Sequence, residues 1–158
     1  MNGLRRYLSL AVAGLFCSYV FCASALAAEY VSVKKDGVNI RSGPNATDPV
    51  VMEVFRGFPL QVQETKGNWL HVIDYEKGKG WISKDMTDNT KTVIVISKPS
   101  ANMRQEPNTK SAKIADVDAG VVLQLVGKKG DWRQVKHSGE KNKDVIVGWL
   151  HKNLVWPQ

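Results

Sequence analysis

The chain has 158 residues, of which 43% are hydrophobic and 23% charged, and a formal net charge of +7 at pH 7. Both of its cysteines, Cys17 and Cys22, lie near the amino terminus. This excludes a disulfide framework in the rest of the chain, so each folded unit must be held by an apolar core of its own.

Residues 1–27 have the layout of a secretory signal peptide. A basic pair, Arg5 and Arg6, precedes a mostly apolar stretch at 8–20, and small residues precede a cut between Ala27 and Ala28. The alternative is an uncleaved anchor, because the apolar stretch approaches the roughly 20 residues that span a bilayer. We expect an exported protein, periplasmic or secreted, with no transmembrane segment after cleavage.

Residues 29–88 and 89–158 are two copies of one unit. The segment Asn39-Ile-Arg-Ser-Gly-Pro-Asn45 returns as Asn102-Met-Arg-Gln-Glu-Pro-Asn108, at an offset of 102 − 39 = 63. Gly67-Asn-Trp69 returns as Gly130-Asp-Trp132 at the same offset, whereas Gly80-Trp-Ile82 returns as Gly148-Trp-Leu150 at an offset of 68. The chain is therefore an internal duplication whose second copy has an insertion of 68 − 63 = 5 residues between Lys136 and Val147.

The apolar residues of each copy recur with a short period between turn-forming residues, which predicts strands and not helices. Gly67 and Gly130 lie in turns where a positive φ is expected, and the polar stretch 87–90 is expected to link the copies. The predicted strands are 30–33, 50–55, 60–62, 69–73 and 80–82 in copy one, and 93–96, 114–117, 121–126, 132–135 and 145–150 in copy two. We expect an all-β protein made of two tandem small barrels, each with its own core.

Four tryptophans are repeated between the copies, as the pairs Trp69/Trp132 and Trp81/Trp149. A repeated large aromatic residue in a small barrel is usually part of the core. The alternative is that one of each pair lines a shallow groove beside the first long loop. Trp156 has no counterpart, so it either caps its barrel or lies exposed.

The repeated Asn and Arg residues, Asn39 with Arg41 and Asn102 with Arg104, have two interpretations. They either hold the local turn and pair with neighbouring groups, or they form a ligand site together with Trp81 and Trp149. Pro44 and Pro107 stiffen the adjacent loops, because proline fixes φ.

Charge is shared unevenly between the copies. Residues 29–88 contain 8 basic and 9 acidic residues, and residues 89–158 contain 12 and 6. The inserted loop adds Lys136, Lys141 and Lys143, which suggests contact with an anionic wall polymer or lipid headgroups. The alternative is a merely solvated loop.

The chain offers little for catalysis. No cysteine follows the signal segment, and no serine lies in a Gly-x-Ser-x-Gly motif. The three histidines are too scattered for a metal site. We therefore expect no enzyme activity, no metal and no cofactor, and the two copies leave no room for a separate catalytic domain.

The ordered set Asn-Ile-Arg-Ser-Gly-Pro, Gly57, Gly-Asn-Trp69 and Gly-Trp81-Ile, present twice, resembles the bacterial Src-homology-3 (SH3b) family. The second copy departs at Gln105-Glu106, where the first has Ser42-Gly43. The resemblance implies small barrels of five to seven strands that serve as binding modules in the cell envelope, and some relatives recognise peptidoglycan stem peptides or cross-bridges. It favours a monomeric protein that binds peptidoglycan and no nucleic acid. The alternative is an adaptor for another envelope protein, such as a hydrolase or a sensor.

Overall fold

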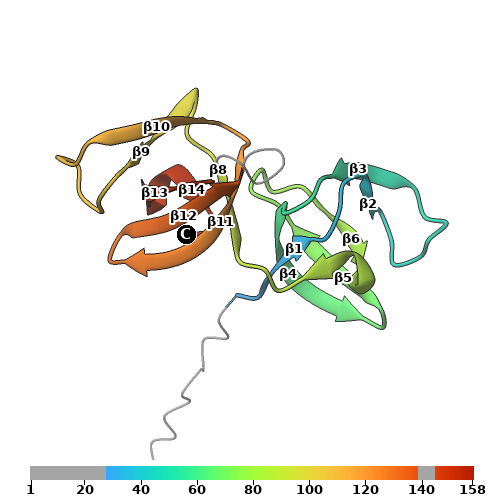
Figure 1. Ribbon diagram of the computed structural model, residues 1–158. Coiled ribbons are helices and arrows are strands. Elements are labelled where there is room, and N and C mark those ends of the chain that lie inside the picture. The colour runs from blue at the N-terminus through green and yellow to red at the C-terminus, as the bar shows by residue number, and fades with distance from the viewer. Residues whose placement is uncertain (1–27, 139–144) are drawn as a thin grey trace, which may run out of the picture.

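The protein consists of two antiparallel sheets of seven strands each, joined by residues 89–91, as seen in a computed structural model that describes residues 28–138 and 145–158 (Figure 1). The first sheet has the strand order β3-β2-β6-β5-β4-β1-β7, and the second repeats it as β10-β9-β13-β12-β11-β8-β14. The described residues contain no α-helix, only short 3-10 turns. The all-β prediction is confirmed.

The elements follow one another in the same way in both modules. Module one contains β1 (Tyr30–Val33), β2 (Val38–Arg41), β3 (Val50–Val54), β4 (Pro59–Lys66), β5 (Trp69–Ile73), β6 (Lys79–Ser83), the 3-10 turn η1 (Lys84–Met86) and β7 (Thr87–Asp88). Module two contains β8 (Thr92–Val95), β9 (Ser100–Arg104), β10 (Lys113–Asp118), β11 (Val122–Lys129), β12 (Trp132–Ser138), β13 (Val145–His151), η3 (Lys152–Leu154) and β14 (Val155–Trp156).

The two sheets are not closed barrels. The end strands β3 and β7 of the first sheet do not pair with each other, and neither do β10 and β14 of the second. Each sheet instead curls around its apolar side and leaves two edges. Only a full ring of paired strands would remove those edges.

The Asn-x-Arg motif lies on strands β2 and β9, as expected for its arginines, whereas its asparagines were expected at the mouth of a turn. In β2, Val38 and Ile40 are buried while Asn39 and Arg41 are half-exposed. Alternate residues of a strand point to opposite faces, so Asn39 and Arg41 share the face away from the core. The predicted positive φ values at Gly67 and Gly130 are confirmed, at 57° and 54°.

The insertion lengthens one hairpin of module two. Strands β12 and β13 have seven residues each, whereas their counterparts β5 and β6 have five. In module one the short turn is held by Asp74, a buried residue whose carboxylate accepts hydrogen bonds from the backbone N–H groups of Glu76 and Gly78, both at 2.8 Å. The predicted basic residues Lys141 and Lys143 lie outside the described residues.

The apolar cores are built from aliphatic side chains and not from the repeated tryptophans. Leu60, Ile82, Leu123 and Leu150 are fully buried, and none of the four repeated tryptophans belongs to either buried cluster. The expectation that they form the core is therefore wrong. In β5, Leu70 and Val72 point inward, which places Trp69 on the opposite face.

The two modules are not independent, because module two completes the core of module one. Ile94 on β8 is 1% exposed and belongs to the buried cluster of module one. Trp156 packs against the same cluster, and its ring meets Tyr30 edge-on with centroids 5.5 Å apart. The expectation that each module rests entirely on its own core is wrong for module one.

A chain of hydroxyl groups fastens the junction. The Thr92 hydroxyl donates to the backbone carbonyl of Gly57 at 2.7 Å and lies 2.6 Å from the hydroxyl of Ser32, which reaches the Thr90 carbonyl at 2.6 Å. Ser32 is 2% exposed. The predicted linker 87–90 is shorter than expected, since Thr87 and Asp88 form β7 and only residues 89–91 separate the two sheets.

Gly57 of module one lies close to module two, and its counterpart Gly120 provides a control. Both have positive φ, at 81° and 87°, but a Cβ at Gly57 would lie 3.1 Å from Val122 Cγ1 of module two, whereas a Cβ at Gly120 meets nothing within 4 Å. We expect Gly120→Ala to lower the free energy of unfolding by about 1–2 kcal/mol through backbone strain alone. Gly57→Ala should cost more, because Val122 must also move, and urea unfolding of both variants measures the difference. Equal losses would show that the junction is loosely packed.

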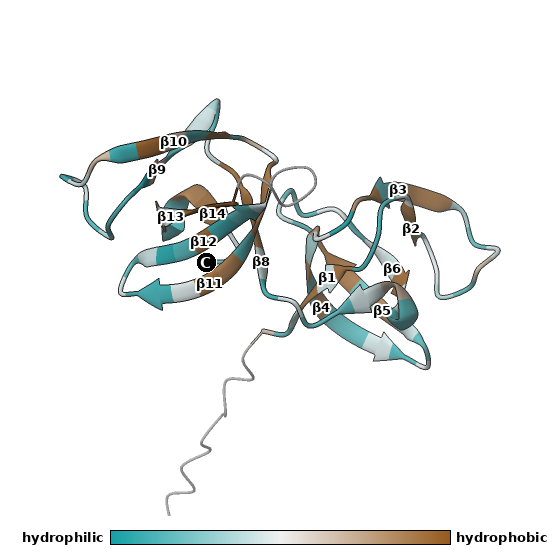
Figure 2. Ribbon diagram, viewed as in Figure 1, coloured by the Kyte–Doolittle hydropathy of each residue, from teal (hydrophilic) through white to brown (hydrophobic). Residues whose placement is uncertain are grey.

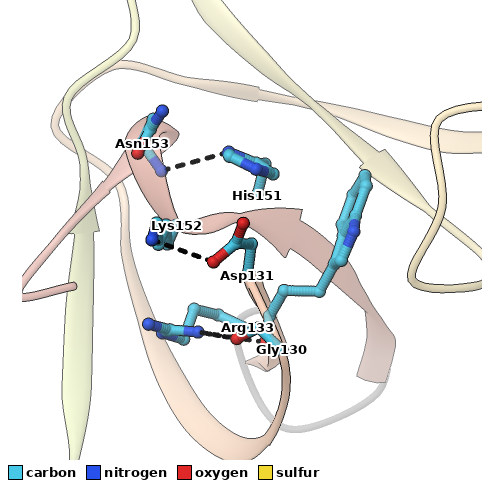
Figure 3. Close-up of polar contacts among 7 residues, drawn as sticks. Gly130, Asp131, Arg133, His151, Lys152 and Asn153 are labelled. Carbon is cyan, nitrogen blue, oxygen red and sulfur yellow. Dashed lines mark hydrogen bonds and ion pairs between the residues drawn. The ribbon is translucent and has the colours of Figure 1, made fainter.

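Arg133 is a charged residue inside module two, at the position that Leu70 occupies in module one. It is 7% exposed, its Nη1 donates to the carbonyls of Gly130 at 3.0 Å and Trp132 at 3.2 Å, and its Nε has no hydrogen-bond partner (Figure 3). Neither salt bridge between described residues involves it. A buried donor without a partner and a charge without a counter-ion both oppose folding.

We therefore expect Arg133→Leu, which restores the residue type of module one, to raise the free energy of unfolding by about 1 kcal/mol or more. Thermal and urea unfolding measure the change. Arg133→Ala is the matched control, because it removes the same charge but leaves a cavity, and it should be less stable than the leucine variant. A leucine variant less stable than the native protein would show that the guanidinium contributes net stability.

Candidate functional site

A shallow groove lies on module one beside strand β2, and we call it the β2 groove. Its volume is about 300 Å³, at the small end of the range for ligand sites. The side chains that give it chemical character are Lys35, Asn39, Arg41, Trp69, Ser83 and Met86. It therefore combines an ammonium group, an amide and a large aromatic surface.

Strand register explains why these residues meet. Arg41 of β2 lies opposite Trp81 of β6, and β6 in turn places Ser83 opposite Trp69 of β5. Directly opposite residues of antiparallel strands project to the same face. Asn39, Arg41 and Trp81, which the sequence singled out, thus share one face with Trp69 and Ser83.

Trp81 borders the groove without lining it. Its ring stacks on His71 of the adjacent strand, with centroids 4.9 Å apart and an interplanar angle of 33°. The aromatic side chain that lines the groove is Trp69. Sequence reasoning did not assign Lys35, Ser83 or Met86 to a site, although the two-residue spacing from Trp81 to Ser83 already places these two on one face.

Arg41 shapes the loop that follows it. Its Nη1 donates to the Asp48 carbonyl at 2.7 Å, and the Asp48 carboxylate accepts hydrogen bonds from the backbone and side-chain nitrogens of Asn45. Arg104 makes the equivalent bond to the Ser111 carbonyl, also at 2.7 Å, and the Ser111 hydroxyl accepts from the Glu106 backbone N–H. The departure at Gln105-Glu106 therefore leaves the arginine anchor of the second loop in place.

The corresponding face of module two contains Asn102 and Arg104 on β9 and Trp149 on β13, with Arg104 opposite Trp149. Several groove positions differ between the modules, among them Gly37/Ser100 and Ala46/Thr109, and the largest change in side-chain size is at the position opposite the tryptophan, where His151 replaces Ser83. The His151 ring meets Trp132 edge-on, with centroids 5.5 Å apart. The two faces thus have the same framework and different surfaces.

Lys136 lies on the same side of β12 as Trp132, four residues further along the strand. It is half-buried on β12, opposite Gln124 of β11 and Val147 of β13. Because Lys141 and Lys143 fall outside the described residues, the structure brings only this one member of the predicted basic loop into view.

The described residues offer no alternative chemistry. Residues 28–138 and 145–158 contain no group of three or more His, Cys, Asp or Glu side chains that would hold a metal ion. In the same part of the chain no helix is long and apolar enough to cross a membrane. Burial raises the pKa of Tyr75, and the hydrogen bond from Lys152 lowers the pKa of Asp131, but neither group lines the β2 groove.

Comparison with known proteins gives one curated relative and several solved structures. The chain is 22% identical over 164 residues to the "Putative N-acetylmuramoyl-L-alanine amidase YrvJ" of Bacillus subtilis, and the alignment covers 96% of this chain but 30% of the amidase.

Among solved structures, NlpC1 of Trichomonas vaginalis is 13% identical with a TM-score of 0.36, over 86% of this chain and 48% of that one. An NlpC/P60 family protein of Bacillus cereus is 14% identical with a TM-score of 0.37, over 80% and 55%. Likenesses this weak do not indicate a shared function.

The bacterial SH3 domain family matches residues 34–88 and, separately, residues 97–157. Each segment covers six of the seven strands of one sheet, β2–β7 or β9–β14, together with the repeated motifs Asn-x-Arg and Gly-x-Trp. The chain belongs to the bacterial SH3 domain family and contains two copies of the domain in tandem.

Proposed function

We propose that this protein is a non-catalytic, exported binding protein whose β2 groove holds a short peptide segment of peptidoglycan. The observation that carries the proposal is the grouping of Trp69, Asn39 and Lys35 in one groove on the exposed face of module one. Supporting it, the curated relative is described as an amidase of N-acetylmuramoyl-L-alanine, the junction between the sugar and the peptide of peptidoglycan.

The groove chemistry suits such a segment. Stem peptides present small aliphatic side chains, backbone amides and free carboxylates. An indole provides a flat apolar surface for the aliphatic part, an asparagine amide both donates to and accepts from a backbone amide, and the exposed Lys35 ammonium complements a carboxylate.

A protein partner is the competing function, and a separate observation favours it. Val145, Ile146 and Val147 of β13 are 48%, 38% and 45% exposed. Figure 2 shows apolar stretches also on β3 and β10, where Val50, Val51 and Ile114 are exposed. Contiguous exposed apolar surface often marks protein interfaces. An adaptor of this kind would bind through these strands and leave the groove empty.

Retention of the whole protein on purified sacculi tests the proposal. We expect the native chain to cosediment with sacculi and Trp69→Ala to lower the affinity by about tenfold, because the flat apolar surface of the groove is lost. Circular dichroism confirms that the variant is folded. Native protein that stays in the supernatant would rule out the proposed ligand and leave the adaptor function.

Charge is tested with a matched pair in the same module. Lys35→Glu should weaken retention by about fivefold, since it replaces an attraction to ligand carboxylates by a repulsion. Lys77→Glu, in the exposed turn between β5 and β6 and outside the groove, changes the net charge equally and should have no effect. Equal effects of both reversals would mean that net charge, and not the groove, governs binding.

A further inference from the structure

We infer that His151 closes the counterpart of the β2 groove on module two, so that the chain binds one groove ligand and not two. This inference rests on the proposed function for the identity of the ligand, but the closure itself concerns only this chain. Among the lining positions that differ between the modules, it assigns the closure to the one opposite the tryptophan, Ser83 in module one and His151 in module two.

The two positions are equivalent in the fold. Ser83 lies directly opposite Trp69 on the neighbouring strand, and His151 lies directly opposite Trp132. Side chains in such pairs share one face, with Cβ atoms about 4.5–5.5 Å apart. A serine is too short to reach across the indole beside it, whereas an imidazole is long enough to cover it.

His151 occupies this space in the structure. Its ring packs edge-on against Trp132 at an interplanar angle of 89°, which is a favourable geometry for two aromatic rings. A ligand at this position would have to displace the imidazole from the indole.

Two further contacts hold the imidazole and the turn that follows it in place (Figure 3). The His151 Nδ1 accepts a hydrogen bond from the backbone N–H of Asn153 at 3.4 Å, which caps η3. The next residue, Lys152, forms a 2.8 Å salt bridge with Asp131, in the turn just before Trp132. The His151 ring is therefore held by its hydrogen bond to Asn153, and the backbone next to it by the salt bridge of Lys152.

The backbone shows that the two residues are exchangeable. Ser83 has φ −67° and ψ 136°, and His151 has φ −70° and ψ 141°. Both residues immediately precede a three-residue 3-10 turn, η1 or η3. A histidine placed at position 83 thus has the backbone conformation and the following 3-10 turn of His151. It lacks a counterpart of the Lys152–Asp131 salt bridge, because Asn68 stands at the position of Asp131.

The first experiment needs no ligand. N-bromosuccinimide oxidises accessible indoles, and peptide mass spectrometry of the full chain reports each tryptophan separately. We expect Trp69 to react several-fold faster than Trp132 in the native protein. Ser83→His should slow the oxidation of Trp69, and His151→Ser should accelerate the oxidation of Trp132. If Trp69 and Trp132 are oxidised at equal rates in the native protein, or if neither substitution changes these rates, the inferred closure is wrong.

The second experiment is calorimetric titration of the full chain with a soluble disaccharide-peptide fragment released from sacculi. We expect one equivalent to bind and Ser83→His to bind about tenfold more weakly. The control Lys77→His adds an imidazole in the exposed turn between β5 and β6, outside the groove, and should keep the affinity within about twofold of native. His151→Ser should retain the native site. Two equivalents in the native protein, or native affinity in Ser83→His, would contradict the inference. If the fragment does not bind at all but the tryptophans are oxidised as expected, the proposed ligand is wrong and the inferred closure still holds.

Discussion

The packing of module two against the core of module one is the constraint on which the architecture depends. A unit of about 60 residues buries only about 60% of its unfolded surface and is marginally stable alone. Module one adds Ile94 and Trp156 from its neighbour. The Thr92 hydroxyl, bonded to the Gly57 carbonyl and next to the buried Ser32, fastens this contact. Tandem arrangement is thus part of how module one is stabilised, and module two contributes to folding whether or not it binds a ligand.

The duplicated sequence has kept its backbone framework while individual positions have diverged. Arg41 and Arg104 make the same loop contact, to carbonyls seven residues further on. In contrast, the buried Leu70 is replaced by Arg133, and Phe58, which packs edge-on with Phe55 and also contacts Tyr75, by Val121. The two modules thus share the loop anchors and buried pairs such as Leu60 and Leu123 or Val72 and Val135, while other core and outer-face positions have changed.

Much of this structure follows from the sequence, and what does not has a physical reason. The offset of 63 residues predicted two equivalent units, and short apolar periods predicted strands. The strand position of Asn39 was missed because a motif rich in turn formers hides a two-residue alternation. We expected the tryptophans in the core because their side chains are large. Their place in the strand argues otherwise, since Leu70 and Val72 already occupy the inward positions of β5. The difference between Ser83 and His151 is visible in the sequence, but only the strand register shows that each faces a tryptophan.

Charge and groove lie on different modules, which separates long-range attraction from recognition. Residues 89–158 hold 12 basic and 6 acidic residues, while the open groove lies in the nearly balanced module one. Exposed charges act over about 8–10 Å at physiological salt, so an excess of lysines raises the local concentration of an anionic polymer without selecting a particular segment of it. Selection requires contact with shaped groups, which Trp69, Asn39 and Lys35 supply. On the proposed function, a polymer attracted by the second module would be held close to the groove of the first, because the two modules are packed together at Gly57 and Val122.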